Sequence, residues 1–332
     1  NGNISETSWR TANTDNSLKW YRYGFDALNR ITSATDNTGN YNVSNITYDK
    51  MGNIQSLTRN GWQNGSPYTN MDILNYDYHN SEVSNRLYKV RDDGNDTYGF
   101  KDSSADDQDY WYDQNGNMTR DDNKCITAIE YNHLNMPTKV TVTGTEAGTL
   151  DYIYAADGTK LQKKKTQGGT PTITDYAGNY VYEGGSLKQI SLTEGYIEPN
   201  GSSWQYVYYL KDHQNNTRIT YSDDNGNGSI DPATEIRREQ NYYPFGLEHK
   251  GYNGSIYGAK NNLKTFQDQE FTEDLGLNVH EWKYRMSDPT VGRFWQVDPL
   301  ADKYRFNSPY AFAENRVING IELEGLEYAS YS

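Results

Sequence analysis

The strongest constraint on this chain is a short unit of sequence that recurs with small changes. In each copy an aromatic residue ends one apolar run, a short polar turn follows, and an apolar residue opens the next run. An Asp or Asn at the start of such a turn accepts hydrogen bonds from backbone N–H groups two residues on. A Gly or Asn three residues later supplies the positive φ that short hairpin loops need. Each copy is therefore predicted to be a β-hairpin; they occupy residues 112–119, 48–54, 25–31, 131–137 and 154–161.

A hairpin of this kind cannot bury its own apolar face, so several copies must pack side by side. Period-two alternation continues beyond the last clear copy, for example in residues 180–182 and 204–210. This pattern predicts an all-β array of antiparallel strands in which Tyr rings stack between neighbouring repeats. The run Lys163-Lys164-Lys165 is interpreted as an exposed or edge strand that the lysines protect against further pairing.

Composition agrees with a folded protein whose interior is unusually polar. Hydrophobic residues make up only 34% of 332 residues, but the chain contains 31 Tyr and 7 Trp. Tyrosine can build a core or line a wet cavity because its apolar ring carries a polar tip. The length predicts either two domains or one extended repeat array.

Charge and cysteine content narrow the class of protein. The net charge of −14 argues against binding to nucleic acid or insertion into an anionic membrane, and it fits a secreted or cell-surface protein. One cysteine excludes an intramolecular disulfide framework, and no apolar run reaches the length of a transmembrane helix. Because the sequence begins at Asn1 without Met, we expect it to be a piece of a longer protein.

The pattern changes near residue 240. After this point the turns no longer repeat, Pro becomes more frequent, and short apolar stretches interrupt the chain. We therefore expect a β-repeat segment over residues 1–240 and a capping or closing element over residues 241–332.

One loop has the spacing of a calcium site. Oxygen-bearing side chains stand at positions one, three and five, a Gly stands at position six, and an acid follows at position nine. The flanking segments read as strands, so the alternative is a polar hairpin tip that binds no metal. The residues expected to hold a structural Ca²⁺ are Asp223, Asn225, Asn227, Ser229 (through its backbone carbonyl), Asp231 and, one place later than usual, Glu235.

The closing element holds two Asp-Pro pairs ten residues apart, at Asp288 and Asp298. Two carboxylates in a partly dry site can share a proton and act as an acid and a base in peptide hydrolysis. Asp-Pro is also common in ordinary turns, so spacing alone leaves both readings open. The five His are scattered and no nucleophile motif is present, which argues against an ordinary enzyme with a diffusible substrate.

The hairpin units resemble the YD repeats of Rhs proteins, and the C-terminal stretch resembles the Rhs repeat-associated core domain. The sequence Glu322-Leu323-Glu324-Gly325-Leu326-Glu327-Tyr328 is similar to that of the core domain found in Bacteroidota. The most specific matches are Tyr242-Tyr243-Pro244-Phe245-Gly246, Tyr284-Arg285-Met286-Ser287-Asp288-Pro289, Gly292-Arg293-Phe294, Val297-Asp298-Pro299-Leu300-Ala301 and Ser308-Pro309-Tyr310-Ala311-Phe312.

This resemblance implies a spiral β-sheet shell, or cocoon, whose end is plugged by the core domain with irregular strands and short helices. In the family the shell encloses a variable C-terminal polypeptide, often a toxin, until delivery. The resemblance thus implies two partners: the chain's own passenger and a delivery or secretion machinery.

The resemblance also implies an aspartyl autoprotease that acts only on its own chain. Asp298 matches the family's catalytic aspartate, Asp288 and Arg293 are expected helpers, and the cleaved bond would join Leu326 to Glu327. Ala301 stands where the family motif has Gly, and Glu322-Leu323 stands where Asp-Pro is usual.

The alternative function is a structural or adhesive surface protein. In that case exposed Tyr and Trp rings would bind glycans or a protein partner. Inward-facing rings favour the shell, and an exposed aromatic cluster favours adhesion.

Overall fold

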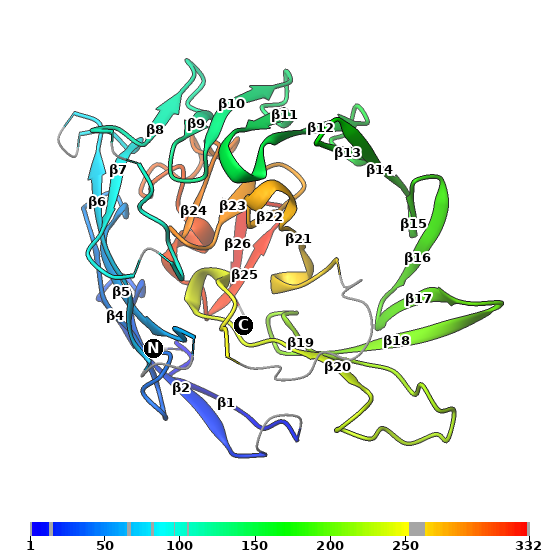
Figure 1. Cartoon of the computed structure of the whole chain (residues 1–332). Helices are drawn as coiled ribbons and strands as arrows, with labels where there is room; N and C mark the ends of the chain where they lie inside the picture. Colours follow the sequence, from blue (N-terminus) through cyan, green and yellow to red (C-terminus); the bar gives the residue numbers. More distant parts are fainter. Residues whose placement is uncertain are drawn as a thin grey trace.

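A long wall of antiparallel strands curves around a smaller C-terminal part in the computed structural model of the chain (Figure 1). The structure describes residues 2–12, 16–64, 68–80, 83–95, 97–104, 106–251 and 263–330. The wall consists of two sheets in which every strand pairs with its neighbours in sequence. The prediction of an all-β repeat shell with a C-terminal plug is thus confirmed.

The first sheet has seven strands in sequence order. They are β1 (Glu6–Trp9), β2 (Lys19–Phe25), β3 (Ile31–Asp36), β4 (Val43–Tyr48), β5 (Ile54–Gly61), β6 (Thr69–Tyr78) and β7 (Leu87–Asp92).

The second sheet has thirteen strands, again in sequence order. They are β8 (Tyr110–Tyr112), β9 (Met118–Asp121), β10 (Ile126–Tyr131), β11 (Pro137–Val142), β12 (Gly148–Tyr154), β13 (Lys160–Gln167), β14 (Thr170–Ala177), β15 (Tyr180–Glu183), β16 (Ser186–Leu192), β17 (Gly195–Asn200), β18 (Ser203–Lys211), β19 (Thr217–Tyr221) and β20 (Ile236–Glu239). A short 3-10 turn, η1 (Gly144–Glu146), connects β11 to β12.

The two ends of the wall meet, so the wall surrounds its interior. The Arg218 guanidinium lies 4.6 Å from the centre of the Trp9 ring, and the Thr11 hydroxyl donates a 2.9 Å hydrogen bond to the Glu239 carboxylate. Both contacts join the N-terminal region around β1 to the last strands, β19 and β20.

The repeated turns form as the sequence predicts. In residues 112–118 the Asp113 carboxylate accepts a 2.8 Å hydrogen bond from the Asn117 N–H, and Gly116 has φ +88°. Asp49 accepts equivalent bonds from Met51 and Asn53. The structure adds one copy that the sequence reading missed, at residues 212–216, where Asp212 accepts from the backbone of Gln214 and Asn216.

In three places a Tyr hydroxyl ties the end of a strand to the preceding hairpin. The hydroxyl groups of Tyr48, Tyr78 and Tyr131 donate to the carbonyls of Ile31, Ile54 and Met118, at 2.6, 2.6 and 2.5 Å. Each acceptor is the first residue after an earlier turn. The ring is therefore buried while its polar tip is satisfied, which explains why this position is Tyr.

The described residues after β20 fill the interior of the wall (Figure 1). They form two small sheets. The first has four strands, β21 (Glu270–Thr272), β22 (Val279–Glu281), β23 (Met286–Asp288) and β24 (Arg293–Phe294). The second is a hairpin of β25 (Gly320–Leu323) and β26 (Glu327–Ser330). Four 3-10 turns connect them: η2 (Pro244–Gly246), η3 (Phe266–Asp268), η4 (Asp274–Gly276) and η5 (Phe312–Asn315). We call residues 240–330 the plug.

The wall and the plug share one hydrophobic core. Wall residues such as Ile54 and Leu150 belong to the same buried cluster as Phe294 and Phe312 of the plug. The last wall strand ends at Glu239, next to the change of pattern expected near residue 240. The two parts nevertheless do not have separate hydrophobic cores. No helix among the described residues has the length and apolar character needed to span a membrane.

The lysine run corrects one prediction. Lys163 is 8% exposed and β13 lies in the middle of the thirteen-stranded sheet, so it is not an edge strand. Its ammonium contacts Glu270 at 3.1 Å and Asp274 at 3.0 Å, both in the plug. Lys163 and Lys165 pair with plug carboxylates, which a reading of strand sequence alone does not reveal.

The tips of the repeat turns also contact the plug. The Tyr310 hydroxyl donates a 2.6 Å hydrogen bond to the Gly116 carbonyl, and the Asn315 side chain donates a 2.8 Å bond to the Gly52 carbonyl. A Cβ at Gly116 would lie 2.6 Å from a Val297 methyl group and 2.9 Å from the Tyr310 oxygen. Glycine is required here both by the positive φ and by the close approach of the plug.

We expect Gly116→Ala to lower the free energy of unfolding by about 2–3 kcal/mol, because the added methyl group strains the backbone and displaces the plug. Gly169→Ala is the matched control: Gly169 has φ +82°, but a Cβ at this position would have nothing within 4 Å. Denaturant unfolding measures both. Equal losses for the two variants would show that contact with the plug contributes nothing.

Candidate functional site

Three residues that the sequence connects with self-cleavage lie around one small cavity in the plug. Asp298, Glu322 and Leu326 line a space of about 20 Å³ beside Arg285. A cavity of this size holds about one water molecule. The predicted catalytic aspartate and the residue before the predicted cleavage point therefore lie at the same place.

Arg285 joins the two carboxylates. One nitrogen of its guanidinium, Nη2, lies 3.1 Å from Asp298 Oδ2 and 3.3 Å from Glu322 Oε1. The side chains of Arg285 and Glu322 are almost fully buried, and that of Asp298 is 13% exposed. The Arg285 Nε–H also donates to the Gly325 carbonyl, next to Leu326.

Separate elements position these groups. Asp298 follows β24, where its N–H donates to the Pro309 carbonyl and its carboxylate accepts from the Leu300 N–H at 2.7 Å. Glu322 lies on β25, and its second oxygen accepts a 2.9 Å hydrogen bond from the Ala313 N–H of η5. These bonds fix both carboxylates before any reaction.

The predicted cleavage point follows a tight turn between β25 and β26. The Leu326 N–H donates to the Leu323 carbonyl at 2.8 Å, and both central residues have positive φ, Glu324 at +53° and Gly325 at +76°. Two positive φ values characterise the hairpin turn known as type I′. A Cβ at Gly325 would lie 2.9 Å from Trp282, so this glycine is required.

Burial shifts both carboxyl groups in the same direction. Desolvation raises the pKa of Glu322 to about 7, although Arg285 opposes this rise. Desolvation also raises the pKa of Asp298, again against the effect of Arg285, and the nearby Glu327 carboxylate raises it further. Near neutral pH the site can therefore hold one protonated and one ionised carboxyl group, the arrangement that acid–base hydrolysis of a peptide requires.

The structure does not bring the other two predicted residues to this cavity. Asp288 is buried beside the wall, where its carboxylate lies 3.1 Å from the Lys124 ammonium and accepts from Thr290. Arg293 reaches into the wall and donates to Tyr78 at 3.0 Å and to the Asn85 carbonyl at 2.6 Å. Both residues attach the plug to the wall.

Sequence reasoning did not assign a role to Glu322 or Arg285. The sequence did contain a signal for each residue. Glu322 stands where the terminal family motif has Asp, and Arg285 lies in a stretch that matches the core domain. What was missing was the geometry, because 37 residues separate Arg285 from Glu322.

The predicted calcium loop lies between β19 and β20. The Asp223 and Asn225 side-chain oxygens both accept from the Asn227 N–H, at 3.1 and 3.0 Å. The Glu235 carboxylate folds over the loop and accepts from the Asn225 N–H at 3.2 Å. The Asp223, Asn225 and Glu235 oxygens thus accept hydrogen bonds from backbone N–H groups of the same short segment.

Asp231 behaves differently from the expected ligand. Its two oxygens accept from the Ala233 N–H at 3.0 Å and the Thr234 hydroxyl at 3.1 Å, so it closes the following turn. Ser229 donates its N–H to the Asn227 side chain at 2.7 Å. Among the described residues, no three His, Cys, Asp or Glu side chains are grouped to hold a metal. Cation binding by Asp223, Asn225, Asn227 and Glu235 stays a prediction from the spacing of the loop.

Comparisons with known proteins give one sequence relative and several structural neighbours. No protein-family model matches the chain. Salivary gland surface protein 1 of Aedes aegypti is 26% identical over 234 residues, which cover 64% of this chain and 6% of that protein. The chain therefore corresponds to only a small part of the length of this relative.

The structural neighbours include Tc toxin assemblies. A crystal structure of TcdB2-TccC3 matches 97% of this chain and 18% of its own, with a TM-score of 0.58 and 16% identity. The structure of a Photorhabdus luminescens Tc holotoxin pore matches 99% of this chain and 18% of its own, with a TM-score of 0.58 and 15% identity. The fold of this chain is therefore that of an Rhs-type shell.

Proposed function

We propose that this chain is the plugged end of a secreted or surface-exposed Rhs shell that encloses its own C-terminal passenger polypeptide, and that it cuts itself after Leu326. The fold similarity to TcdB2-TccC3 and the closed wall around a plug support the shell. The cavity that Asp298, Glu322 and Leu326 share supports the cut. The similarity of its C-terminal stretch to the Bacteroidota version remains a prediction from the sequence.

The space inside the described part suits side chains or an extended strand. Two cavities between wall and plug have volumes of about 320 Å³ each, which is the size of a small-molecule pocket. A third cavity of about 240 Å³ is lined by charged groups of both signs, among them Lys163, Lys188, Glu183 and Arg238. A folded passenger would thus lie in further turns of shell, beyond this plug.

Protease digestion of the full-length protein tests the enclosure. A passenger inside the shell is expected to survive digestion under native conditions and to be degraded after the shell is unfolded. Degradation of the passenger at the same rate in both conditions would reject the shell function.

The proposed cut is hydrolysis by a water molecule in the 20 Å³ cavity. The ionised Asp298 carboxylate accepts a proton from the water, whose oxygen attacks the Leu326 carbonyl carbon. Protonated Glu322 donates its proton to the Glu327 nitrogen as the carbon–nitrogen bond breaks. The products are the Leu326 carboxylate and a new amino terminus at Glu327, and Arg285 holds both acids throughout.

Self-cleavage is expected to slow as pH rises above about 7. Burial raises the pKa of Glu322 to about 7, so the proton donor is present below this pH and is lost above it. The rate of mass change of the refolded chain, followed by intact-mass measurement over a pH series, measures this. A rate that increases steadily from about pH 6 to about pH 8 would assign the proton to another group.

We further propose that the loop between β19 and β20 binds Ca²⁺ through Asp223, Asn225, Asn227 and Glu235, where a bound cation would hold the loop between its strands. Removing calcium with EDTA is expected to lower the melting temperature, because a cation that binds only the folded state stabilises it by about 2.7 kcal/mol at a hundredfold excess over Kd. Asp223→Ala is expected to abolish the response. An unchanged melting temperature with EDTA would reject the site.

The alternative function, adhesion through exposed aromatic rings, has one observation in its favour. Most Tyr rings of the repeats are buried, but Trp204, Tyr206 and Tyr208 on β18 are 51%, 51% and 41% exposed. Adhesion predicts that the intact protein binds a glycan or protein partner through these rings. Trp204→Ala would then abolish this binding while the shell stays closed.

A further inference from the structure

One part of the outer wall differs from the rest. Six large apolar side chains on β15, β16 and β18 are between 41% and 54% exposed, and we call them the outer aromatic face: Tyr180, Leu192, Trp204, Tyr206, Tyr208 and Leu210. On β10, by contrast, the exposed positions are Thr127 and Glu130. A contiguous exposed apolar patch marks an interaction site.

The strand register shows that these side chains lie on one surface. Residues directly opposite each other in an antiparallel pair project to the same side of the sheet. Two rows cross four strands each, and both contain only uncharged residues. The rows are Tyr180, Ile190, Ile197 and Tyr206, and then Leu192, Gly195, Tyr208 and Tyr221.

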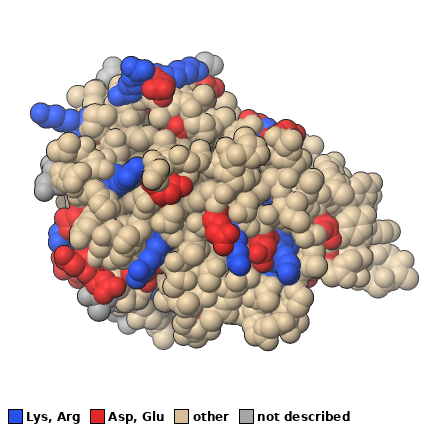
Figure 2. Space-filling view, turned by 90° about the horizontal axis from the view of Figure 1, so that it is seen from above, with Lys and Arg blue, Asp and Glu red and all other residues tan. Residues whose placement is uncertain are grey.

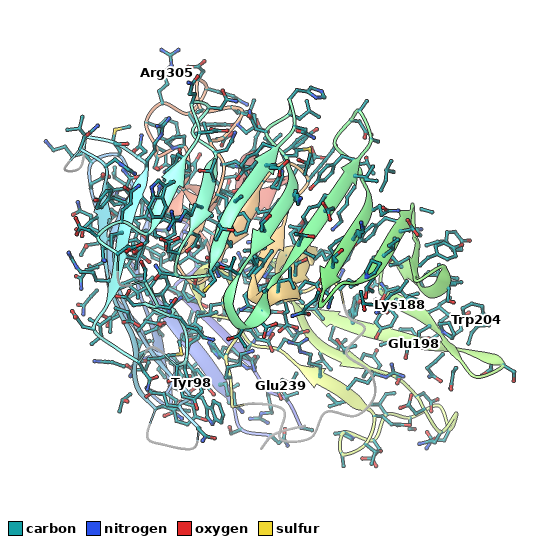
Figure 3. The ribbon with its side chains drawn as sticks, turned by 45° about the horizontal axis from the view of Figure 1, so that its top comes forward. Tyr98, Lys188, Glu198, Trp204, Glu239 and Arg305 are labelled. Carbon is teal, nitrogen blue, oxygen red and sulfur yellow. The ribbon has the colours of Figure 1, made fainter. Side chains whose placement is uncertain are left out.

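The alternate residues of the same strands show that this surface faces away from the plug. On β18, Tyr209 is only 6% exposed, and the Lys211 ammonium lies 2.9 Å from Asp268 of the plug. Val181 of β15 lines an interior cavity with plug residues. In Figure 3, Trp204 lies at the outer margin of the wall, whereas Lys188 and Glu198 lie nearer its interior.

Three Tyr rings of the outer wall stack on one another. The rings of Tyr206 and Tyr208 are nearly parallel, with centroids 6.4 Å apart and an interplanar angle of 18°. The Tyr221 ring continues the stack, 5.5 Å from that of Tyr208. These rings pack against one another, so little side-chain freedom is lost when a partner covers them.

Charge and area indicate the kind of partner. The chain carries a net charge of −14, but the right-hand part of the molecule, where β15 to β18 lie, shows almost no charged side chains in Figure 2. Six half-exposed side chains of this size present on the order of 500–700 Å², close to the roughly 800 Å² that each partner buries in a standard interface. An uncharged apolar sheet face can pack on another sheet face of the same character.

We propose that two copies of this chain pack face to face through their outer aromatic faces, as a two-fold symmetric dimer. On this surface no charged residue of the two rows would face its copy in the partner. The isologous arrangement needs one self-complementary patch, and the outer aromatic face supplies it. This assembly goes beyond the proposed shell function and does not depend on self-cleavage.

Sedimentation velocity and light scattering over a hundredfold dilution series test the proposal. The wild-type chain is expected to show twice the mass of one chain, and Tyr206→Lys is expected to weaken the dimer by about 30-fold or more, as loss of a central aromatic contact does. Trp204→Ser provides a second, uncharged disruption, and an unchanged melting temperature for each variant shows that it folds. The control, Phe306→Lys, alters a side chain that is 66% exposed elsewhere, and it is expected to leave the dimer intact.

Three outcomes would overturn the dimer. One is a wild-type chain of monomer mass at every concentration. Another is an equal loss of dimer in Phe306→Lys and Tyr206→Lys. The third is a monomer whose outer aromatic face binds immobilised polysaccharide, which would assign the face to a glycan.

Discussion

Asp298→Asn is expected to leave the chain folded and uncut, whereas the wild-type chain loses the six residues that follow Leu326. The amide cannot accept the proton of the attacking water, and removing a catalytic acid or base slows such reactions by about 10²–10⁴-fold. The Leu300 N–H can still donate to the remaining side-chain oxygen, so the local turn is preserved. Intact-mass measurement under denaturing conditions separates the cut and uncut chains.

Asp302→Asn is the matched control for this experiment. The Asp302 carboxylate lies four residues after Asp298, but its side chain is 99% exposed and pairs only with Arg305. We expect it to cut at the wild-type rate. Identical full-length masses for the wild type and Asp298→Asn would sink the protease mechanism, while the shell function would still stand.

Asp72→Ala is expected to be the most damaging single change in the wall, costing about 3–5 kcal/mol of unfolding free energy. The Arg59–Asp72 pair is fully buried with a 2.6 Å contact, and Arg59 also donates to the Thr290 carbonyl of the plug at 2.6 Å. Asp72 accepts a further 2.7 Å bond from the Phe100 N–H. Without the carboxylate, the guanidinium stays buried and uncompensated.

The Asp77–Arg91 pair offers a control in the same sheet. Its contact is also short, 2.8 Å, but the side chains are 42% and 53% exposed. Exposed pairs contribute about 0–1 kcal/mol, so Asp77→Ala should change little. Replacing both buried partners, Arg59→Met with Asp72→Leu, is expected to recover much of the loss in denaturant unfolding. Equal losses for Asp72→Ala and Asp77→Ala would contradict the importance of burial.

The repeat unit could be read from the sequence because its information is local. An Asp, a Gly and the flanking aromatic residue lie within a few positions, and their hydrogen bonds close within the same turn. The copy at Asp212 was missed because Lys211 stands where other copies have an aromatic residue. Its turn nevertheless forms with the same hydrogen bonds, since the Asp and Asn determine them.

The partners of the lysine run and of the two expected helper residues could not be read for the opposite reason. Lys163 pairs with Glu270, 107 residues away, and Arg293 bonds to Tyr78, 215 residues away. A buried charge is stable only with its partner, and nothing near Lys163 or Arg293 in the sequence names that partner. The strand pattern alone therefore suggested an exposed strand, and the expected helper role rested on the family resemblance.

By itself, the sequence determined the hairpin unit, the all-β wall and the change of character near residue 240. The cut after Leu326 by Asp298 stays a prediction from the resemblance to the Rhs core domain. Turn hydrogen bonds and strand alternation depend on residues only a few positions apart, so both can be predicted from the order of residues along the chain. Only the tertiary structure decided that Glu322 lies near Asp298, that Arg285 joins these two carboxylates, and that the aromatic residues of β18 face outward. Those facts depend on which distant segments meet when wall and plug close on one shared core, because burial and charge pairing are properties of the assembled interior.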